Sequence, residues 1–259
     1  MAEQYTFDER VKKVIIDEAM SYKKYFVDYE YLVCSENFVH SKYYIIDARE
    51  SNYKHLTGVN SDLPASEFFD KCLSGTLALS DFDYMKQTQN QDNVKGSVRR
   101  KIKALPEVSH LFQDNVMVEE DFKKNRICCA FAVGKKACTI GFHIAGKARP
   151  MTLLKGYELN DRNAKPVSLV LRKKAGADKF DEIIHGTPAD LIKYQPSIKN
   201  MLSAVLLDKM HEEEVKLMLI RTLELELSGK TARNIQNAKI FLTFQNHMAR
   251  IIHRFQNQQ

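Results

Sequence analysis

The chain has 259 residues, 44% of them hydrophobic and 28% charged, a composition typical of globular proteins and unlike that of disordered or fibrous ones. The formal net charge of +6 favours an acidic partner such as nucleic acid. No apolar run is long enough to span a membrane and Met1 to Asp8 is not signal-like, so we expect a cytoplasmic protein. The five cysteines stand in apolar contexts without zinc-ligand spacing, so we expect reduced core thiols, no metal site and no cofactor.

The N-terminal part of the chain is predicted to be mainly helical. From Phe7 to Val39, apolar residues recur every three or four positions, no Gly or Pro interrupts the pattern, and a break could fall near Asp28 to Glu30. Tyr43 to Ala48 is an aromatic and β-branched run typical of a strand. A helix is then predicted over residues 66–73, and a basic amphipathic helix over residues 96–111, which Pro106 should divide.

The middle of the chain changes to short apolar runs that favour strands. Residues 127–133 and 137–144 are joined by Gly-Lys-Lys, which predicts a hairpin. Residues 149–154 and 166–172 are two further predicted strands, separated by a polar turn, and they could be neighbours in the sheet. A last strand is predicted over residues 180–184.

The C-terminal part is predicted to be helical from Thr187 onward, because Pro188 suits the first turn of a helix. Amphipathic helices are predicted over residues 198–207, 213–227 and 231–255. These helices could pack back onto the preceding domain, which is their commoner use, or could serve a protein partner or self-association.

These segments together predict an α+β fold in two parts. Residues 1–186 should form N-terminal helices and a small antiparallel sheet, and residues 187–259 a helical C-terminal extension.

The segment Tyr53-Lys54-His55-Leu56-Thr57-Gly58-Val59 is the first candidate for a chemical site. It places a cation, a group that titrates near neutral pH and a hydroxyl within four residues, directly after a predicted strand. The alternatives are a solvated Lys-His pair and a helix or turn cap at Thr57-Gly58.

With this segment in view, the sequence resembles a phage-borne nuclease-like family of the barnase, EndoU, colicin and RelE group (the BECR fold), the fourth of that series. Members are similar in carrying an aromatic-Lys-His-Leu-Thr-Gly segment just after a strand. The other matching parts, in order, are an aromatic-rich helix (Ala65 to Leu73), a Leu-Ser turn (Leu79-Ser80), a Pro-x-Thr-Leu-Leu strand (Pro150 to Leu154) and a Pro-Val-Ser-Leu-Val strand (166–170). The resemblance covers residues 5 to 185, and residues 187–259 match no family that we can name.

The resemblance implies a BECR-like sheet and a ribonuclease of phage or mobile-element origin, a toxin that acts in host-virus conflict. RNases of this fold cleave RNA without a metal: the ribose 2′-OH attacks its own phosphodiester, leaving a 2′,3′-cyclic phosphate. Such a reaction needs a base, an acid and cations for the developing charge. His55 is the candidate acid or base, Lys54 would neutralise phosphate, Thr57 would orient it, and Arg172 could engage two phosphate oxygens.

Further residues are candidates for binding RNA. The hydroxyls of Thr152 and Ser168 could bind phosphate or could pair within the sheet. Lys173 extends the patch around Arg172, while Arg99 and Arg100 could follow a nucleic-acid backbone or form a solvated helix face. The alternative function is a catalytically silent module that binds nucleic acid or protein and engages a host or phage defence factor.

Overall fold

The computed structural model describes residues 5–87, 89–112 and 116–227, and the description below concerns these residues. The chain divides into two compact units, Met1–Leu206 and Leu207–Gln259. The described part of the second unit, residues 207–227, is helical throughout. The helix predicted over residues 231–255 lies outside the described residues.

The first helix ends much earlier than its periodicity predicts. Helix α1 spans Phe7–Tyr22, and a π-helical turn over Lys23–Val27 follows it. Thr6 and Glu9 cap the start of α1 reciprocally, because the Thr6 N–H donates to Glu9 Oε2 at 2.7 Å and the Glu9 N–H to Thr6 Oγ1 at 3.3 Å. The helical segment ends near Asp28, where a break could be expected, but strand β1, Tyr29–Cys34, then follows, so the prediction of helix from Phe7 to Val39 is wrong beyond Val27.

The helices predicted over residues 66–73 and 96–111 agree better with the sequence pattern. Short 3-10 turns cover Glu50–Asn52 and Leu79–Asp81; the helices are α2 (Tyr53–Thr57), α3 (Ala65–Leu73) and α4 (Gln91–Ala104), and a 3-10 turn over Leu105–His110 follows α4. The division expected at Pro106 is confirmed, since the regular helix stops two residues earlier.

The sheet is larger than expected and is mixed rather than antiparallel. Its nine strands follow the order β11-β10-β1-β2-β8-β7-β6-β3-β9, and the β2–β8 pair is parallel. The other strands are β2 (Tyr43–Asp47), β3 (Met117–Glu120), β6 (Phe131–Gly134), β7 (Cys138–Ala145), β8 (Lys147–Lys155), β9 (Lys165–Pro166), β10 (Leu169–Lys174) and β11 (Glu182–His185). Strands β4 (Lys123–Lys124) and β5 (Ile127–Cys128) pair separately. The β6–β7 pair confirms the predicted hairpin.

The expected pairing of the two late strands is wrong, because β1 and β2 lie between β8 and β10 in the sheet. After β8 the chain runs to β9, which pairs with β3 at one edge, before β10 pairs with β1 near the other. Thr152 lies on β8, while Ser168 lies in the short link between β9 and β10. The two hydroxyls therefore belong to separate parts of the sheet.

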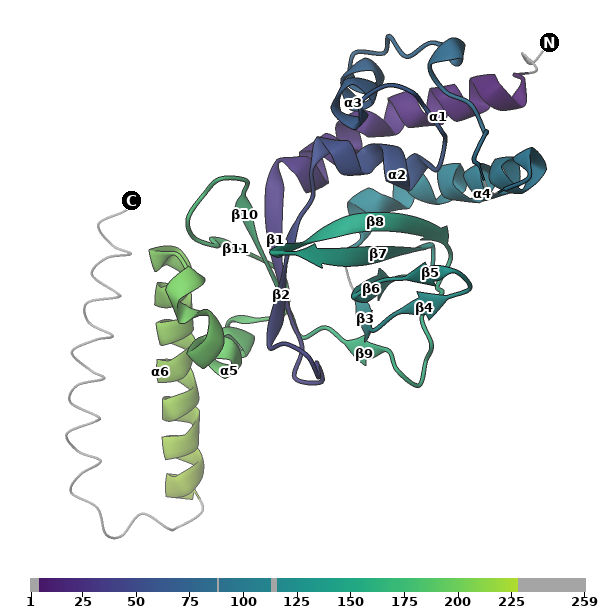
Figure 1. The fold of residues 1–259 in the computed structure, drawn as a ribbon. Helices are drawn as coiled ribbons and strands as arrows, with labels where there is room; N and C mark the ends of the chain where they lie inside the picture. The colour runs from purple at the N-terminus through teal and green to yellow at the C-terminus, as the bar shows by residue number, and fades with distance from the viewer. Residues whose placement is uncertain (1–4, 88, 113–115, 228–259) are drawn as a thin grey trace. The chain divides into compact units, whose positions relative to one another are not determined.

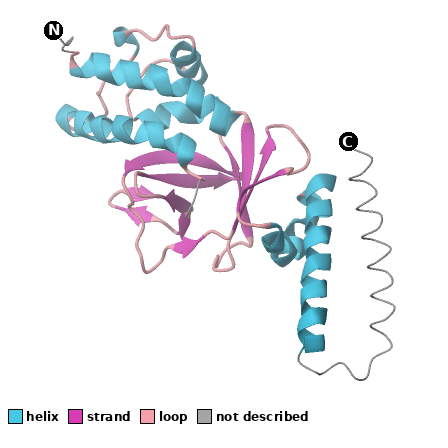
Figure 2. Cartoon of the chain, turned by 180° about the vertical axis from the view of Figure 1, so that it is seen from behind, coloured by secondary structure: helices cyan, strands magenta, loops and turns pink. Residues whose placement is uncertain are grey.

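One face of the sheet is covered by α1 to α4, as Figure 1 shows, and Figure 2 shows the same arrangement from behind. The main core lies there and includes the aromatic ring of Phe131, whose centroid is 4.3 Å from that of Tyr44 and 4.9 Å from that of Phe142. Because side chains alternate along a strand, the residues between the core positions of β1, β2 and β8 point to the opposite face.

Helix α5 spans Pro188–Ile198 and belongs to the first compact unit. Thr187 begins it as predicted, with its N–H and hydroxyl both donating to Asp190 Oδ2 at 2.8 Å. The helix expected over residues 198–207 begins only at Ala204: a 3-10 turn over Lys199–Met201 and an extended link come first, because Phe180 pairs with Met201 and Ser203 through backbone hydrogen bonds of 2.8 Å. Helix α6, Ala204–Leu227, also contains the helix predicted over residues 213–227, which is confirmed.

Candidate functional site

The segment around His55 forms a one-turn helix, α2, and not a turn at the end of a strand. Gly58 ends this helix with φ of +80°, a left-handed conformation that glycine adopts without steric cost, and its N–H donates to Lys54 O at 3.3 Å. The helical conformation means that Lys54 and His55 do not alternate across a strand.

Most of this segment is committed to local structure. Tyr53 and Leu56 have no exposed surface, and the Tyr53 hydroxyl donates to Ile15 O at 2.6 Å. The Thr57 hydroxyl is buried and donates to Lys54 O at 2.8 Å. His55 remains exposed.

Lys54 also has a structural role. Its ammonium group donates to Ser61 O at 2.9 Å and to Leu63 O at 2.7 Å, which ties the following loop to α2. These two carbonyl groups already use donors of the Lys54 ammonium, so Lys54 would stabilise a phosphate mainly through its charge.

The side chain that reaches His55 comes from α4 and was missed by the sequence reasoning. The Lys101 ammonium donates to His55 O at 2.8 Å, and a Cβ added at Gly58 would lie 2.5 Å from Lys101 Cδ. A signal was present in the sequence: Lys101 is three residues after Val98 and four before Leu105, both buried, so it interrupts the apolar stripe of a helix.

The electrostatics around His55 are dominated by positive charge. Partial burial lowers the pKa of His55 below its ordinary value, and Lys101, Lys54 and Lys86 lower it further. Burial lowers the pKa of Lys101 to about 7, with a smaller contribution from Lys86. Partial burial also lowers the pKa of Lys86. At neutral pH, the imidazole is therefore mostly neutral and Lys101 is present in both protonation states, which suits both groups to proton transfer.

Arg172 and Lys173 lie on β10 with different neighbours. The Arg172 guanidinium pairs with Glu182, with Nη2 2.6 Å from Oε2, and stacks 4.2 Å from the ring centroid of Tyr29. The Lys173 ammonium is 3.4 Å from Glu30 Oε2 and donates to a backbone carbonyl in the following turn. The structure thus places these two cations in an environment separate from that of His55.

The other expected binding residues are spread over the first unit. Thr152 is 8% exposed and packs beside Gly141, where an added Cβ would lie 3.0 Å from Thr152 Cγ2. The Ser168 N–H donates to Cys34 O at 3.0 Å. Arg99 and Arg100 lie exposed on α4, as expected, and Arg99 is 5.2 Å from the ring centroid of Phe7.

Gly58→Ala tests whether the close approach of Lys101 matters. Gly75, with φ of +74° and no atom within 4 Å of an added Cβ, provides a matched control. Each alanine should lower the free energy of unfolding by about 1–2 kcal/mol through left-handed strain. The decrease in the free energy of unfolding should be larger for Gly58→Ala than for Gly75→Ala, because the new Cβ at position 58 must displace Lys101. Urea unfolding measures both losses, and equal losses would contradict the expected contact.

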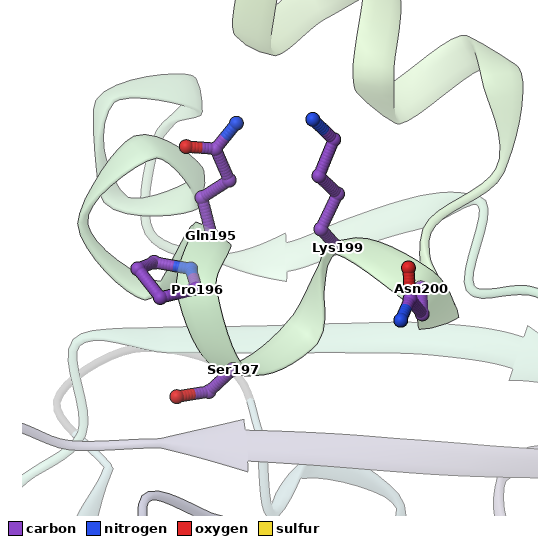
Figure 3. A pocket seen from close by; sticks show the side chains of 5 residues that line it. All are labelled: Gln195, Pro196, Ser197, Lys199 and Asn200. Carbon is purple, nitrogen blue, oxygen red and sulfur yellow. The ribbon is translucent and has the colours of Figure 1, made fainter.

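A hollow of about 350 Å³ lies at the end of α5 and is shown in Figure 3. Its lining contains one ionisable side chain, Lys199, and Figure 3 shows Ser197 pointing to the opposite side from Lys199 and Gln195.

In residues 5–87, 89–112 and 116–227, no three His, Cys, Asp or Glu side chains are placed to hold a metal ion. Within these same ranges, no helix has the length and hydrophobicity to cross a membrane.

The helices on one face of a curled mixed sheet define an α+β protein, with a histidine among lysines at its helical side. A family model described as phage-Barnase-EndoU-ColicinE5/D-RelE like nuclease4 (PBECR4) matches residues 15–183, about two thirds of the chain. The chain therefore belongs to this family, which confirms the resemblance seen in the sequence. No curated protein and no solved structure matches the chain.

Proposed function

We propose that the protein is a metal-independent endoribonuclease that cleaves RNA by attack of the ribose 2′-OH on its own phosphodiester. Membership of a BECR-type nuclease family supports nuclease chemistry in general. The observation that carries the finer proposal is the exposed His55 beside lysines with lowered pKa values. An acid and a base that titrate near neutral pH, together with positive charge, are what this reaction requires.

In the proposed reaction, neutral His55 accepts the proton of the 2′-OH as the O2′–P bond forms. The P–O5′ bond breaks, and the protonated form of Lys101 donates a proton to the departing O5′. Lys86 and Lys54 stabilise the negative charge that develops on the phosphorane oxygens, because opposite charges attract strongly where water is partly excluded. The products are a 2′,3′-cyclic phosphate and a 5′-OH.

The remaining candidates have supporting roles in this proposal. Thr57 holds the turn of α2 that presents His55. Arg99 and Arg100 lie exposed on the helix that also carries Lys101, so they are suited to contact the RNA backbone beside the reacting phosphate. Arg172, Lys173, Thr152 and Ser168 would contact RNA at positions distinct from the reacting one.

We further propose that the protein is encoded by a phage or mobile element and acts on RNA in the cytoplasm of a host cell. The family description supports the phage association. A second candidate function is a catalytically silent module that binds nucleic acid or a defence protein. It is favoured by the structural use of Tyr53, Lys54, Leu56 and Thr57, which accounts for most of the segment without catalysis.

The test is cleavage of end-labelled total RNA and transfer RNA by the purified protein with a chelator present. The matched control is DNA of the same sequence, which lacks the attacking 2′-OH. Cleavage of RNA but not DNA is the expected result. A folded protein that cuts neither substrate, or that cuts only after a divalent metal is added, would contradict the proposed reaction and favour the binding module.

A further inference from the structure

The sheet face turned away from α1 to α4 carries a row of polar, ionisable side chains across five strands. Lys173 on β10 pairs in register with Glu30 on β1, and Glu30 with Asp47 on β2. Arg149 on β8 lies next, with Nη2 3.5 Å from Asp47 Oδ2, and it pairs in register with His143 on β7. Neighbouring strands lie about 4.8 Å apart, so the row forms a continuous polar track across the sheet.

The carboxylate of Glu30 is held by two lysines. Its side chain is 7% exposed, and Oε2 lies 2.7 Å from the Lys147 ammonium and 3.4 Å from that of Lys173. Such a buried carboxylate needs charged partners to offset the loss of its hydration. One partner would neutralise it, so this pairing leaves one positive charge in excess.

The carboxylate of Asp47 repeats this pattern with two arginines. Its Oδ2 lies 3.5 Å from Arg149 Nη2 and 3.9 Å from Arg49 Nε. Arg149 Nε is buried and has no hydrogen-bond partner within the protein. The two carboxylates thus face four cations, and the track has an excess of positive charge that attracts an anion.

A groove of about 560 Å³ adjoins this track between β2 and β8. The two strands share one registered pair, Ile46 with Ala148, and the groove lies on the side of this pair toward the starts of both strands. Tyr43, Ile45 and Ile144 make most of its exposed wall apolar, and its polar lining residues are His40, Ser41, Lys42, Lys147 and Ser197. Lys147, which pairs with Glu30, joins the groove to the polar track.

We propose that this face binds single-stranded nucleic acid, with a base in the groove against Tyr43 and Ile144 and a phosphate on Lys147 and Arg149. Bases stack on aromatic side chains whatever their sequence, and an adjacent cation suits the phosphate. An acidic protein segment would use the cations but would not need the apolar groove. The proposal is independent of the ribonuclease reaction, because His55 lies on α2, which packs against the other face of the sheet.

The experiment measures binding of a fluorescent oligothymidine by anisotropy over a series of salt concentrations. This probe lacks 2′-OH groups, so the proposed reaction cannot cleave it, and binding is read independently of catalysis. The variants are Lys147→Gln, Arg149→Gln and Tyr43→Ala. Lys123→Gln, at an exposed lysine of β4, is the control.

Lys147→Gln and Arg149→Gln should each weaken binding roughly 3- to 10-fold and reduce the salt slope by about 0.7, the value for one phosphate contact on a single strand. Tyr43→Ala should weaken binding without changing the salt slope. The control should bind within about twofold of the unmodified protein, because Lys123 belongs neither to the row of side chains nor to the lining of the groove.

Three results would overturn the proposal: no binding by the unmodified protein, binding by Lys147→Gln equal to that of the control, or displacement of the probe by polyglutamate together with no effect of Tyr43→Ala. The last would indicate an acidic partner. If Arg149→Gln does not fold, Lys147→Gln and Tyr43→Ala still decide the question, since Lys173 continues to pair with Glu30. If the unmodified protein binds oligothymidine but does not cleave RNA, the result would contradict only the proposed ribonuclease reaction and not the binding proposed here.

Discussion

His55→Ala should lower chelator-resistant RNA cleavage by about 10²- to 10⁴-fold, the range that a positioned acid or base contributes. The reason is specific to the site: among Tyr53, Leu56, Thr57 and His55, only His55 is exposed, and its lowered pKa keeps the imidazole ready to accept a proton at neutral pH. The measurement is kcat/KM on a labelled RNA. Thermal unfolding should be nearly unchanged, because the side chain is exposed.

The control for this variant is His211→Ala, an exposed histidine of the second unit. It should cleave RNA at the rate of the unmodified protein. Cleavage by a folded His55→Ala protein within about tenfold of the control would exclude His55 as the acid or base, since a group that transfers a proton in the transition state contributes more than this.

Lys101→Met should stabilise the protein at neutral and acidic pH by a few kcal/mol, and the gain should shrink as the pH rises. Burial lowers the pKa of Lys101 to about 7 in the folded protein, whereas an unfolded lysine titrates near ~10.4. Between these two values the unfolded chain binds a proton that the folded chain lacks, so the stability of the unmodified protein rises with pH. Below pH 7 both states are protonated and the cost of burying the charge is present in full. Methionine keeps the apolar stem beside Gly58 and removes this dependence.

The measurement is the free energy of unfolding from urea titrations at several pH values between about 6 and 10, with Lys103→Met as the control on the exposed side of α4. The difference between Lys101→Met and the unmodified protein should be largest at the acidic end. A difference that stays constant with pH would contradict the lowered pKa. Lys101→Met should also reduce RNA cleavage, because it removes the proposed acid.

The sequence predicted the element types well where one periodicity was clear and failed where two patterns competed. Tyr29 to Cys34 contains apolar residues at spacings that continue the preceding helix, yet its aromatic and β-branched residues also suit a strand. Pairing with β2 on one side and with β10 on the other stabilises the strand, and β10 is far from β1 in the sequence. The parallel β2–β8 pair arises from similarly distant segments, so the size and mixed character of the sheet could not be predicted.

The candidate site was predictable only in part, for a related reason. The 53–59 segment could be recognised as chemically suggestive, but its local pattern did not show that Lys54 and Thr57 bond to the backbone. Lys101 could have been noticed as a charge on an apolar helix stripe. The polar track could not have been noticed in the sequence, because strand pairing brings together Glu30, Asp47 and Arg149 from three different strands.

The chemical identity of the RNA ends tests the central claim most directly. RNA should be cut by the purified protein in the presence of a chelator, and the fragments should be analysed by mass spectrometry. Attack by the 2′-OH predicts 2′,3′-cyclic phosphate ends, opposite 5′-OH ends, and their loss in His55→Ala. Fragments with 3′-OH and 5′-phosphate ends would show that water or another nucleophile attacks the phosphodiester, and would contradict the mechanism proposed for His55 and Lys101.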